Sequence, residues 1–176
     1  MIVMINGAFG VGKSTTALYL AKSLSNAMIY DPEEVGFMLR TIIPDAMKLE
    51  DEKTGDFQDL ELWRVLVVQV AEQIVNKYKC SLIVPMTLKN KDYFNYIFEG
   101  LQSLDKNTYC FCLNASIECI HKRLEERGEK FGSWAHNRTA DCLSSFSSDY
   151  FGEYIDAENI SIKDTVDYII GKLGLV

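Results

Sequence analysis

Short apolar runs alternate along this chain with longer segments in which apolar residues recur every three or four positions. The short runs predict strands near 2–5, 27–30, 81–86, 108–113 and 154–156. The longer segments predict helices near 13–25, 33–42, 57–78, 91–104, 117–128, 134–146 and 162–173. This alternation predicts an α/β fold of three layers, in which helices cover both faces of a parallel sheet.

Two apolar segments indicate how deeply the sheet and its helices are buried. The run SLIVPM at 81–86 is apolar almost without interruption, as expected for a strand covered on both faces. The segment LWRVLVVQVAEQIV at 62–75 is apolar nearly all round, which predicts a largely buried helix. By contrast, the serine-rich stretch SSFSSDYFG at 144–152 predicts a loop or a mobile segment.

Length, charge and cysteine content limit the classes of protein to consider. A chain of 176 residues fits one domain over 1–176 with a sizeable core. Its formal net charge of −7 argues against binding to nucleic acid, whose phosphates require a basic surface. The odd number of cysteines and the lack of a signal peptide predict a reducing cytoplasm. No apolar run approaches the length of a membrane span.

A glycine-rich bend follows the first predicted strand. Residues 7–14, GAFGVGKS, match the pattern GxxxxGK[ST], and the strand and helix that must flank this pattern are both predicted. The alternative is a tight turn in which the glycines serve only packing, but that alternative leaves the lysine and the serine unexplained. The pattern therefore predicts a P-loop that binds a nucleoside triphosphate, with ATP as the expected nucleotide.

The chemistry of a triphosphate accounts for each residue type in this bend. Glycines let backbone N–H groups turn inward around an anion, and the following helix directs its positive end at the same phosphates. Lys13 would reach the β- and γ-phosphates, and the Ser14 hydroxyl would be a ligand of Mg²⁺. The residues expected at the nucleotide are Gly7, Ala8, Phe9, Gly10, Val11, Gly12, Lys13, Ser14 and Thr15.

Residues after the second predicted strand are candidates for binding an acceptor, because ligands of open parallel sheets lie beyond the carboxyl ends of the strands. Asp31 precedes Pro32 and Glu33, where it is either the cap of the next helix or a base for an acceptor hydroxyl. Arg40 ends that helix. It is either a surface residue or a planar group that holds a phosphate of the acceptor.

The third predicted strand lacks an acid that many P-loop proteins carry near its end. An aspartate at this place commonly orients the water on Mg²⁺, but the run LIVPMT contains none. Asp31 is one candidate for the missing carboxylate. Thr87 either contacts the acceptor or the γ-phosphate, or it only ends the strand. The missing acid weakens an assignment as an ordinary ATPase.

Three arginines after the fourth predicted strand are candidates for neutralising charge during phosphoryl transfer. Arg123 and Arg127 are four residues apart, which predicts that they share one helix face, and Arg138 follows. Arginines that lead into a glycine-containing loop suit a closing lid, expected over about 127–150. The alternative is a solvated charged face, because two glutamates are nearby.

Taken together, the motifs resemble known families. INGAFGVGKST and RLEER resemble the P-loop small-molecule kinases of the adenylate and shikimate kinase group. GFMLR is similar to the adenylate kinase segment whose arginine, here Arg40, holds the phosphate of the acceptor nucleotide. INGAFGVGKSTTA, YDPEEVGFMLR, LWR, LIVPMT, SW and NISI together resemble the tunicamycin-resistance ATP-binding proteins of bacteria, from residue 2 to about residue 163.

The resemblance implies a nucleoside-kinase-like fold with five parallel strands in the order 2-3-1-4-5. It implies ATP bound through Gly12, Lys13 and Ser14, a lid around 127–138, and a role in resistance to a nucleoside antibiotic by binding or modifying it. These proteins have been thought to carry a C-terminal membrane-associating extension. The printed chain ends at Val176, right after the last predicted helix, so we expect no stable membrane insertion.

We therefore expect an ATP-dependent phosphotransferase that acts on a small hydroxylated molecule, such as a nucleoside or the antibiotic tunicamycin. In this hypothesis the catalytic residues are Lys13, Asp31, Arg123, Arg127 and Arg138, and the acceptor is bound by Asp31, Arg40 and Thr87. The alternatives are a protein that sequesters the antibiotic without turnover and a slow ATPase with a protein partner. The sequence does not distinguish a monomer from a homodimer.

Overall fold

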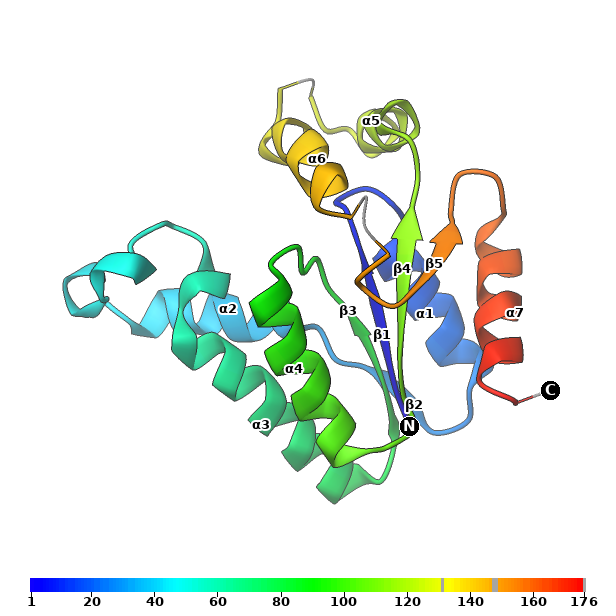
Figure 1. Ribbon diagram of the computed structural model, residues 1–176, viewed down its shortest axis with the longest axis horizontal. Coiled ribbons are helices and arrows are strands. Elements are labelled where there is room, and N and C mark those ends of the chain that lie inside the picture. The colour runs from blue at the N-terminus through cyan, green and yellow to red at the C-terminus, as the bar shows by residue number, and fades with distance from the viewer. Residues whose placement is uncertain (131, 147–148, 176) are drawn as a thin grey trace.

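The centre of the molecule is a five-stranded parallel sheet with the strand order β2-β3-β1-β4-β5 (Figure 1). The computed structural model describes residues 1–130, 132–146 and 149–175. The strands are β1 (Ile2–Gly7), β2 (Ala27–Ile29), β3 (Ser81–Pro85), β4 (Thr108–Asn114) and β5 (Glu153–Asp156). All the pairings between them are parallel, so the predicted sheet and its strand order are confirmed.

Helices cover both faces of this sheet, which Figure 1 shows nearly edge-on. The helices are α1 (Lys13–Ser23), α2 (Pro32–Ile42), α3 (Glu61–Tyr78), α4 (Lys91–Leu104), α5 (Ile117–Glu126), α6 (Trp134–Ser145) and α7 (Ile162–Lys172). α1 packs against α7 on one face, and α3 packs against α4 on the other. α5 and α6 lie together beyond the carboxyl ends of the strands. The predicted three-layer α/β fold is therefore confirmed.

The core follows from the apolar runs in the central strands. Every residue of β1 is buried, and so are the last four residues of β3, because helices cover the sheet on both sides. Trp63, Phe111, Phe146 and Phe151 are the largest of the fully buried side chains. Each such side chain contributes about 2 kcal/mol to folding by leaving water. Within the predicted loop at 144–152, Phe151 is thus part of the core, whereas 147 and 148 lie outside the described residues.

The predicted continuous helix over 57–78 is wrong at its start. A 3-10 turn, Phe57–Asp59, comes first, and the Asp56 carboxylate caps it by accepting from the Gln58 N–H at 3.0 Å. Leu60 then has an extended backbone with ψ of 117°, and the helix begins only at Glu61. Two further 3-10 turns, Asp45–Met47 and Glu50–Glu52, were not predicted. The ends of the other elements differ from the prediction by at most two residues.

The prediction that this helix is largely buried is also wrong. Along α3 the buried side chains are Trp63, Val67 and Ala71, which form a single row at intervals of four residues. Gln69 and Gln73 are exposed on the outer side. The segment is nearly all apolar in sequence, but the sheet and α4 cover only one side of it.

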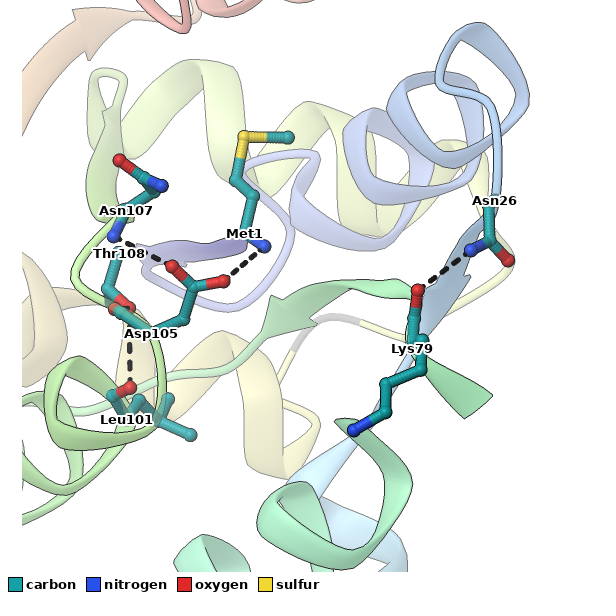
Figure 2. A network of polar contacts seen from close by, with 7 residues as sticks. All are labelled: Met1, Asn26, Lys79, Leu101, Asp105, Asn107 and Thr108. Atoms are coloured by element: carbon teal, nitrogen blue, oxygen red, sulfur yellow. Dashed lines mark hydrogen bonds and ion pairs between the residues drawn. The ribbon is translucent and has the colours of Figure 1, made fainter. Parts of the chain in front are cut away.

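The amino ends of the strands are closed by polar contacts, which Figure 2 shows. The Asp105 carboxylate accepts from the amino group of Met1 at 2.5 Å and from the backbone N–H of Asn107 at 2.8 Å. The Asn26 side-chain amide donates to the Lys79 carbonyl at 2.9 Å, and both residues have positive φ, at 54° and 52°. These contacts tie the turns at one end of the sheet, while the glycine bend lies at the opposite, carboxyl end.

Candidate active site

The glycine bend joins β1 to α1 and has the backbone of a nest for an anion. Gly7, Gly10 and Gly12 have φ of 141°, 79° and 114°, in the region that other residues rarely adopt. A Cβ atom on Gly7 would lie only 2.5 Å from the Leu113 carbonyl oxygen. α1 begins without a capping side chain and without an acid in its first turn. Its first backbone N–H groups therefore suit an anionic ligand.

Lys13 is buried in the same bend. Its Nζ donates to the Ala8 carbonyl at 2.9 Å and lies 5.6 Å from the centre of the Phe9 ring. Burial lowers the pKa of Lys13 to about 8, although the nearby Glu33 carboxylate acts to raise it. A buried ammonium that bonds to a neutral carbonyl is stabilised further by an anion, which a phosphate would supply.

A cavity of about 190 Å³ lies against the bend. Its lining includes Lys13, Ser14, Asp31, Glu33 and Arg127. The structure thus brings together six of the residues predicted for the nucleotide and the reaction, which are Phe9, Gly10, Lys13, Ser14, Asp31 and Arg127. Two cations suit phosphates, and the Ser14 hydroxyl and Asp31 carboxylate are the kind of oxygen ligands that would hold Mg²⁺.

A second cavity, of about 450 Å³, adjoins the first and has the size of a small-molecule site. It is lined by Phe9, Glu33, Phe37, Arg40, Arg138 and the segment 54–58. Phe9 and Glu33 line both cavities, so a molecule in the second cavity would be next to a nucleotide in the first. We call the two the phosphate cavity and the acceptor cavity.

Arg40 builds one wall of the acceptor cavity. Its guanidinium donates to the Gly55 carbonyl at 2.6 Å and lies 4.9 Å from the centre of the Phe57 ring. Both contacts fasten the segment 54–58 to α2. Arg40 therefore lines this cavity with part of its hydrogen-bonding capacity used by the wall itself, and its contact with an acceptor stays a prediction.

Of the two roles that the sequence left open for Asp31, the structure shows the helix cap, and the role of base stays a prediction. Its Oδ1 accepts from the backbone N–H of Glu33 at 2.9 Å, which makes it the cap of α2. It also lines the phosphate cavity. It does not line the acceptor cavity, where the sequence-based hypothesis expected it.

Glu33 is the functional candidate that sequence reasoning missed. An acid in the first turn of a helix has an ordinary structural explanation, so the residue carried no separate signal. In the structure it lines both cavities. Burial raises the pKa of its carboxyl group, the Asp31 carboxylate acts in the same direction, and Lys13 opposes them.

The three predicted arginines are placed in three different environments. Arg127 follows the last residue of α5 and lines the phosphate cavity. Arg138 of α6 lines the acceptor cavity. Arg123 lines neither of these two cavities, since its guanidinium donates to the carbonyls of Val11 at 3.0 Å and Ala157 at 2.7 Å. Arg123 thus holds the glycine bend against the end of β5, and its contact with phosphates stays a prediction.

Contacts between α5, α6 and the loop after β3 hold the predicted lid in place. The rings of His121 and His136 stack with centroids 3.6 Å apart and join α5 to α6. Asp141 of α6 forms an ion pair with Lys89 and lies 3.8 Å from the Arg138 guanidinium. Residues 131, 147 and 148 of the predicted lid lie outside the described residues, and closure of this segment stays a prediction.

The strand order and the helices on both faces of the sheet are those of the P-loop kinase fold, and solved structures agree. A sugar kinase from Janibacter is 18% identical, with a TM-score of 0.68, over 99% of this chain and 95% of that one. A gluconokinase from Sinorhizobium meliloti is 13% identical, with a TM-score of 0.67, over 98% and 91%. At these identities the likeness establishes the fold.

A tunicamycin resistance protein from Deinococcus radiodurans is more similar. It is 26% identical, with a TM-score of 0.79, over 99% of this chain and 96% of that one. The resemblance inferred from the motifs is therefore confirmed in three dimensions. No protein-family model and no curated protein sequence matches the chain. Among the described residues, no helix combines the length and apolar character needed to cross a bilayer.

Proposed function

We propose that the protein is an ATP-dependent phosphotransferase that acts on a small hydroxylated molecule, with a nucleoside or a nucleoside antibiotic such as tunicamycin as the expected acceptor. The observation that carries the proposal is the meeting of the phosphate cavity and the acceptor cavity at Phe9 and Glu33. The kinases among the structural neighbours support the reaction class.

In this proposal four residues of the phosphate cavity, Lys13, Ser14, Asp31 and Arg127, have distinct tasks. Lys13 and the first N–H groups of α1 hold the phosphates, and Arg127 neutralises charge on the transferred group. Ser14 and Asp31 would hold Mg²⁺, which would offset the negative charge of the phosphates. Catalysis then comes mainly from positioning and electrostatics.

We assign the acceptor's proton to Glu33 in place of Asp31. The acceptor oxygen forms a bond to the γ-phosphorus, the bond from that phosphorus to ADP breaks, and the hydroxyl proton passes to the Glu33 carboxylate. Burial raises the pKa of Glu33, which makes its carboxylate a stronger base. Glu33 lines the acceptor cavity, whereas Asp31 does not, and one Asp31 oxygen already caps α2.

Phosphorus NMR of the protein with Mg-ATP, tunicamycin and a panel of nucleosides tests the reaction. We expect a phosphoester signal that grows beyond one equivalent of protein with one of these acceptors. Lys13→Ala should abolish the signal while circular dichroism shows an intact fold, and Lys22→Ala, an exposed lysine of the same helix, should leave it unchanged. Undiminished phosphate transfer by the Lys13→Ala variant would disprove the assignment of the glycine bend as a phosphate-binding loop.

A pair of substitutions separates the two acids at the start of α2. Glu33→Gln should lower kcat by about 10²–10⁴-fold with a smaller change in the KM for ATP, because the proton acceptor is lost while the amide keeps the shape of the side chain. Asp31→Asn should raise the Mg²⁺ concentration required for half-maximal rate. Steady-state kinetics over a series of Mg²⁺ concentrations measures both effects. A larger loss of kcat in Asp31→Asn at saturating Mg²⁺ would return the role of base to Asp31.

The second candidate function is ATP-dependent sequestration of an antibiotic without turnover. The similarity to a tunicamycin resistance protein favours it, and so does the absence of an acid in the run 81–87. Sequestration saturates at one antibiotic molecule per protein and leaves ATP intact beside the bound ligand. Release of ADP and inorganic phosphate without a phosphoester would instead indicate an ATPase.

A further inference from the structure

Asp56 is a charged residue of the acceptor cavity to which the proposed reaction assigns no task. It belongs to the segment 54–58, which forms one wall of that cavity. The backbone N–H of Gln58 donates to Asp56 Oδ1 at 3.0 Å, so this oxygen caps the 3-10 turn Phe57–Asp59. Serine or asparagine would cap the turn equally well. The cap therefore explains neither the second oxygen of Asp56 nor its charge.

The second oxygen, Oδ2, is available to a ligand. Asp56 is half-buried, and its Oδ2 has no hydrogen-bond or ion-pair partner among the described residues. This oxygen is also not one of the fully buried atoms that lack a partner, so it is in contact with the space beside the wall. A carboxylate oxygen that is partly withdrawn from water without a donor is unfavourable, and a donor on a ligand removes that penalty.

The wall that carries Asp56 is held in place from several directions. The Arg64 guanidinium of α3 donates to the Gln58 carbonyl at 3.0 Å, and the Gln58 side-chain amide donates to the Thr87 carbonyl at 2.9 Å. The backbone N–H of Asp56 donates to the Thr54 hydroxyl at 3.1 Å. Together with the contacts from α2 described above, these bonds fix the carboxylate before a ligand arrives, which reduces the entropic cost of binding.

The charges around Asp56 favour an uncharged donor. Glu33 and Asp56 line the acceptor cavity together with Arg40 and Arg138, so the formal charges of these four residues cancel. An ammonium group on the ligand would be repelled by the two arginines. A hydroxyl group donates to a carboxylate without bringing a charge into the cavity, and a hydrogen bond to a charged oxygen is among the stronger ones.

Asp56 also acts on the proposed base. Burial and the Asp31 carboxylate are the main causes that raise the pKa of Glu33, and the Asp56 carboxylate acts in the same direction. The charge of Asp56 is therefore felt where the reacting hydroxyl is expected. A second hydroxyl of the same small molecule could reach Asp56.

We infer that Asp56 binds a hydroxyl of the acceptor other than the one that reacts, with that hydroxyl donating to Asp56 Oδ2. The inference rests on the proposed function, because Asp56 and Glu33 line the same cavity. The acceptor then has at least two hydroxyls, one at Glu33 for transfer and one at Asp56 for recognition. Asp56 determines specificity, since a compound without the second hydroxyl leaves its carboxylate unpaired.

Isothermal titration calorimetry with matched compounds tests the inference. The probes are uridine with its 2′-, 3′- and 5′-deoxy analogues, and D-glucose with its monodeoxy analogues, each titrated with Mg²⁺ and a non-hydrolysable ATP analogue present. Asp56→Ser removes Oδ2 and the charge but keeps an oxygen that caps the turn. Asp51→Ser, at an exposed acid of the preceding 3-10 turn outside the acceptor cavity, removes the same charge and is the control. Thermal unfolding checks that both variants are folded.

We expect one deoxy analogue to bind about 10- to 100-fold more weakly than its parent, because a hydrogen bond to a charged group is lost. This ratio should fall to about one in Asp56→Ser and stay unchanged in Asp51→Ser. The inference is overturned if no probe binds, if every deoxy analogue binds as tightly as its parent, or if Asp56→Ser keeps the ratio.

The phosphorus NMR assay separates this inference from the proposed function. Phosphate transfer with a ratio that does not depend on Asp56 would overturn the inference and leave the proposed function standing. A ratio that depends on Asp56, without phosphate transfer, would support the contact with the hydroxyl and contradict the proposed reaction.

Discussion

At the scale of single residues, Lys13 shows how burial and function act against each other. Its ammonium group lies inside the glycine bend, and burial lowers its pKa from 10.5 to about 8. In the unfolded chain the group keeps its ordinary pKa, so the folded protein binds this proton less tightly. The free energy of unfolding therefore increases as the pH rises from about 8 to 10.5, and the penalty for burying the charge is fully present below pH 8.

Lys13→Met removes this titration and allows the effect to be measured. Between pH 7.5 and 10.5, we expect the unfolding free energy of the unmodified protein to rise by about 3 kcal/mol relative to the variant. Urea unfolding at a series of pH values gives the difference, in which the titration of all other groups cancels. A constant difference would show that Lys13 keeps its ordinary pKa in the folded protein.

At the scale of elements, the end of α5 divides two arginines between two tasks. Arg123 bonds to two backbone carbonyls, one in the glycine bend and one after β5. Arg127, just beyond the helix, lines the phosphate cavity. Arg123, inside α5, therefore stabilises the fold, whereas Arg127, just after α5, is available to the expected ligand.

This division of tasks predicts different consequences for the two alanine variants. Arg123→Ala should lower the unfolding free energy by about 2 kcal/mol, because two carbonyls lose a charged donor. Arg127→Ala should change stability by less than about 0.5 kcal/mol and lower the rate of phosphate transfer by about 10²-fold. Urea unfolding and initial rates measure the two quantities, with exposed Lys122→Ala as the control on the same helix. Equal losses of stability in both arginine variants would contradict the division.

The order of strands and helices along the chain could be predicted because the apolar residues of each element recur at the spacing typical of a strand or of a helix. The bend was predictable for a similar reason, since glycines, lysine and serine must be consecutive in sequence to form it. The start of α3 was not predictable, because Phe57 and Leu60 continue the apolar spacing of the helix while Asp56 caps a separate turn. In that segment the local signal for a cap and the signal from periodicity disagree.

The composition of the site depends on contacts that a single sequence does not specify. Glu33 has the position of an ordinary first-turn acid, and only the approach of α2 to the bend puts it between two cavities. Arg123 and Arg127 were expected on one helix face, but α5 ends at Glu126, before the second of them. Thr87 was predicted to contact the acceptor, but only the packed structure shows that its hydroxyl is buried with no hydrogen-bond partner among the described residues.

At the scale of the whole molecule, the five free cysteines are distributed between parts with different expected stability. Cys110 and Cys112 lie in β4, at the centre of the core. Cys142 is equally buried but belongs to α6, which covers the carboxyl end of the sheet. Exposure of the first two requires global unfolding, whereas movement of α6 alone would expose the third.

Thiol labelling followed by mass spectrometry should therefore report movement of the predicted lid. We expect Cys142 to react faster than Cys110 and Cys112, and Mg-ATP to slow its reaction. Asp141→Asn should speed it by about two- to fivefold, because loss of a partly exposed ion pair costs under about 1 kcal/mol. Cys119 of α5, which is partly exposed, is the internal control. Equal rates for Cys142 and the β4 cysteines would show that α6 opens only when the whole molecule unfolds.

Phe9 has a consequence for how this protein can change during evolution. Phe9 is a shared wall of the phosphate cavity and the acceptor cavity. A substitution there alters both cavities at once, so any effect on a new acceptor comes together with an effect on ATP. Phe37 and the segment 54–57 border the acceptor cavity but not the phosphate cavity. Selection for a different acceptor should accumulate changes at those positions first and leave residue 9 unchanged.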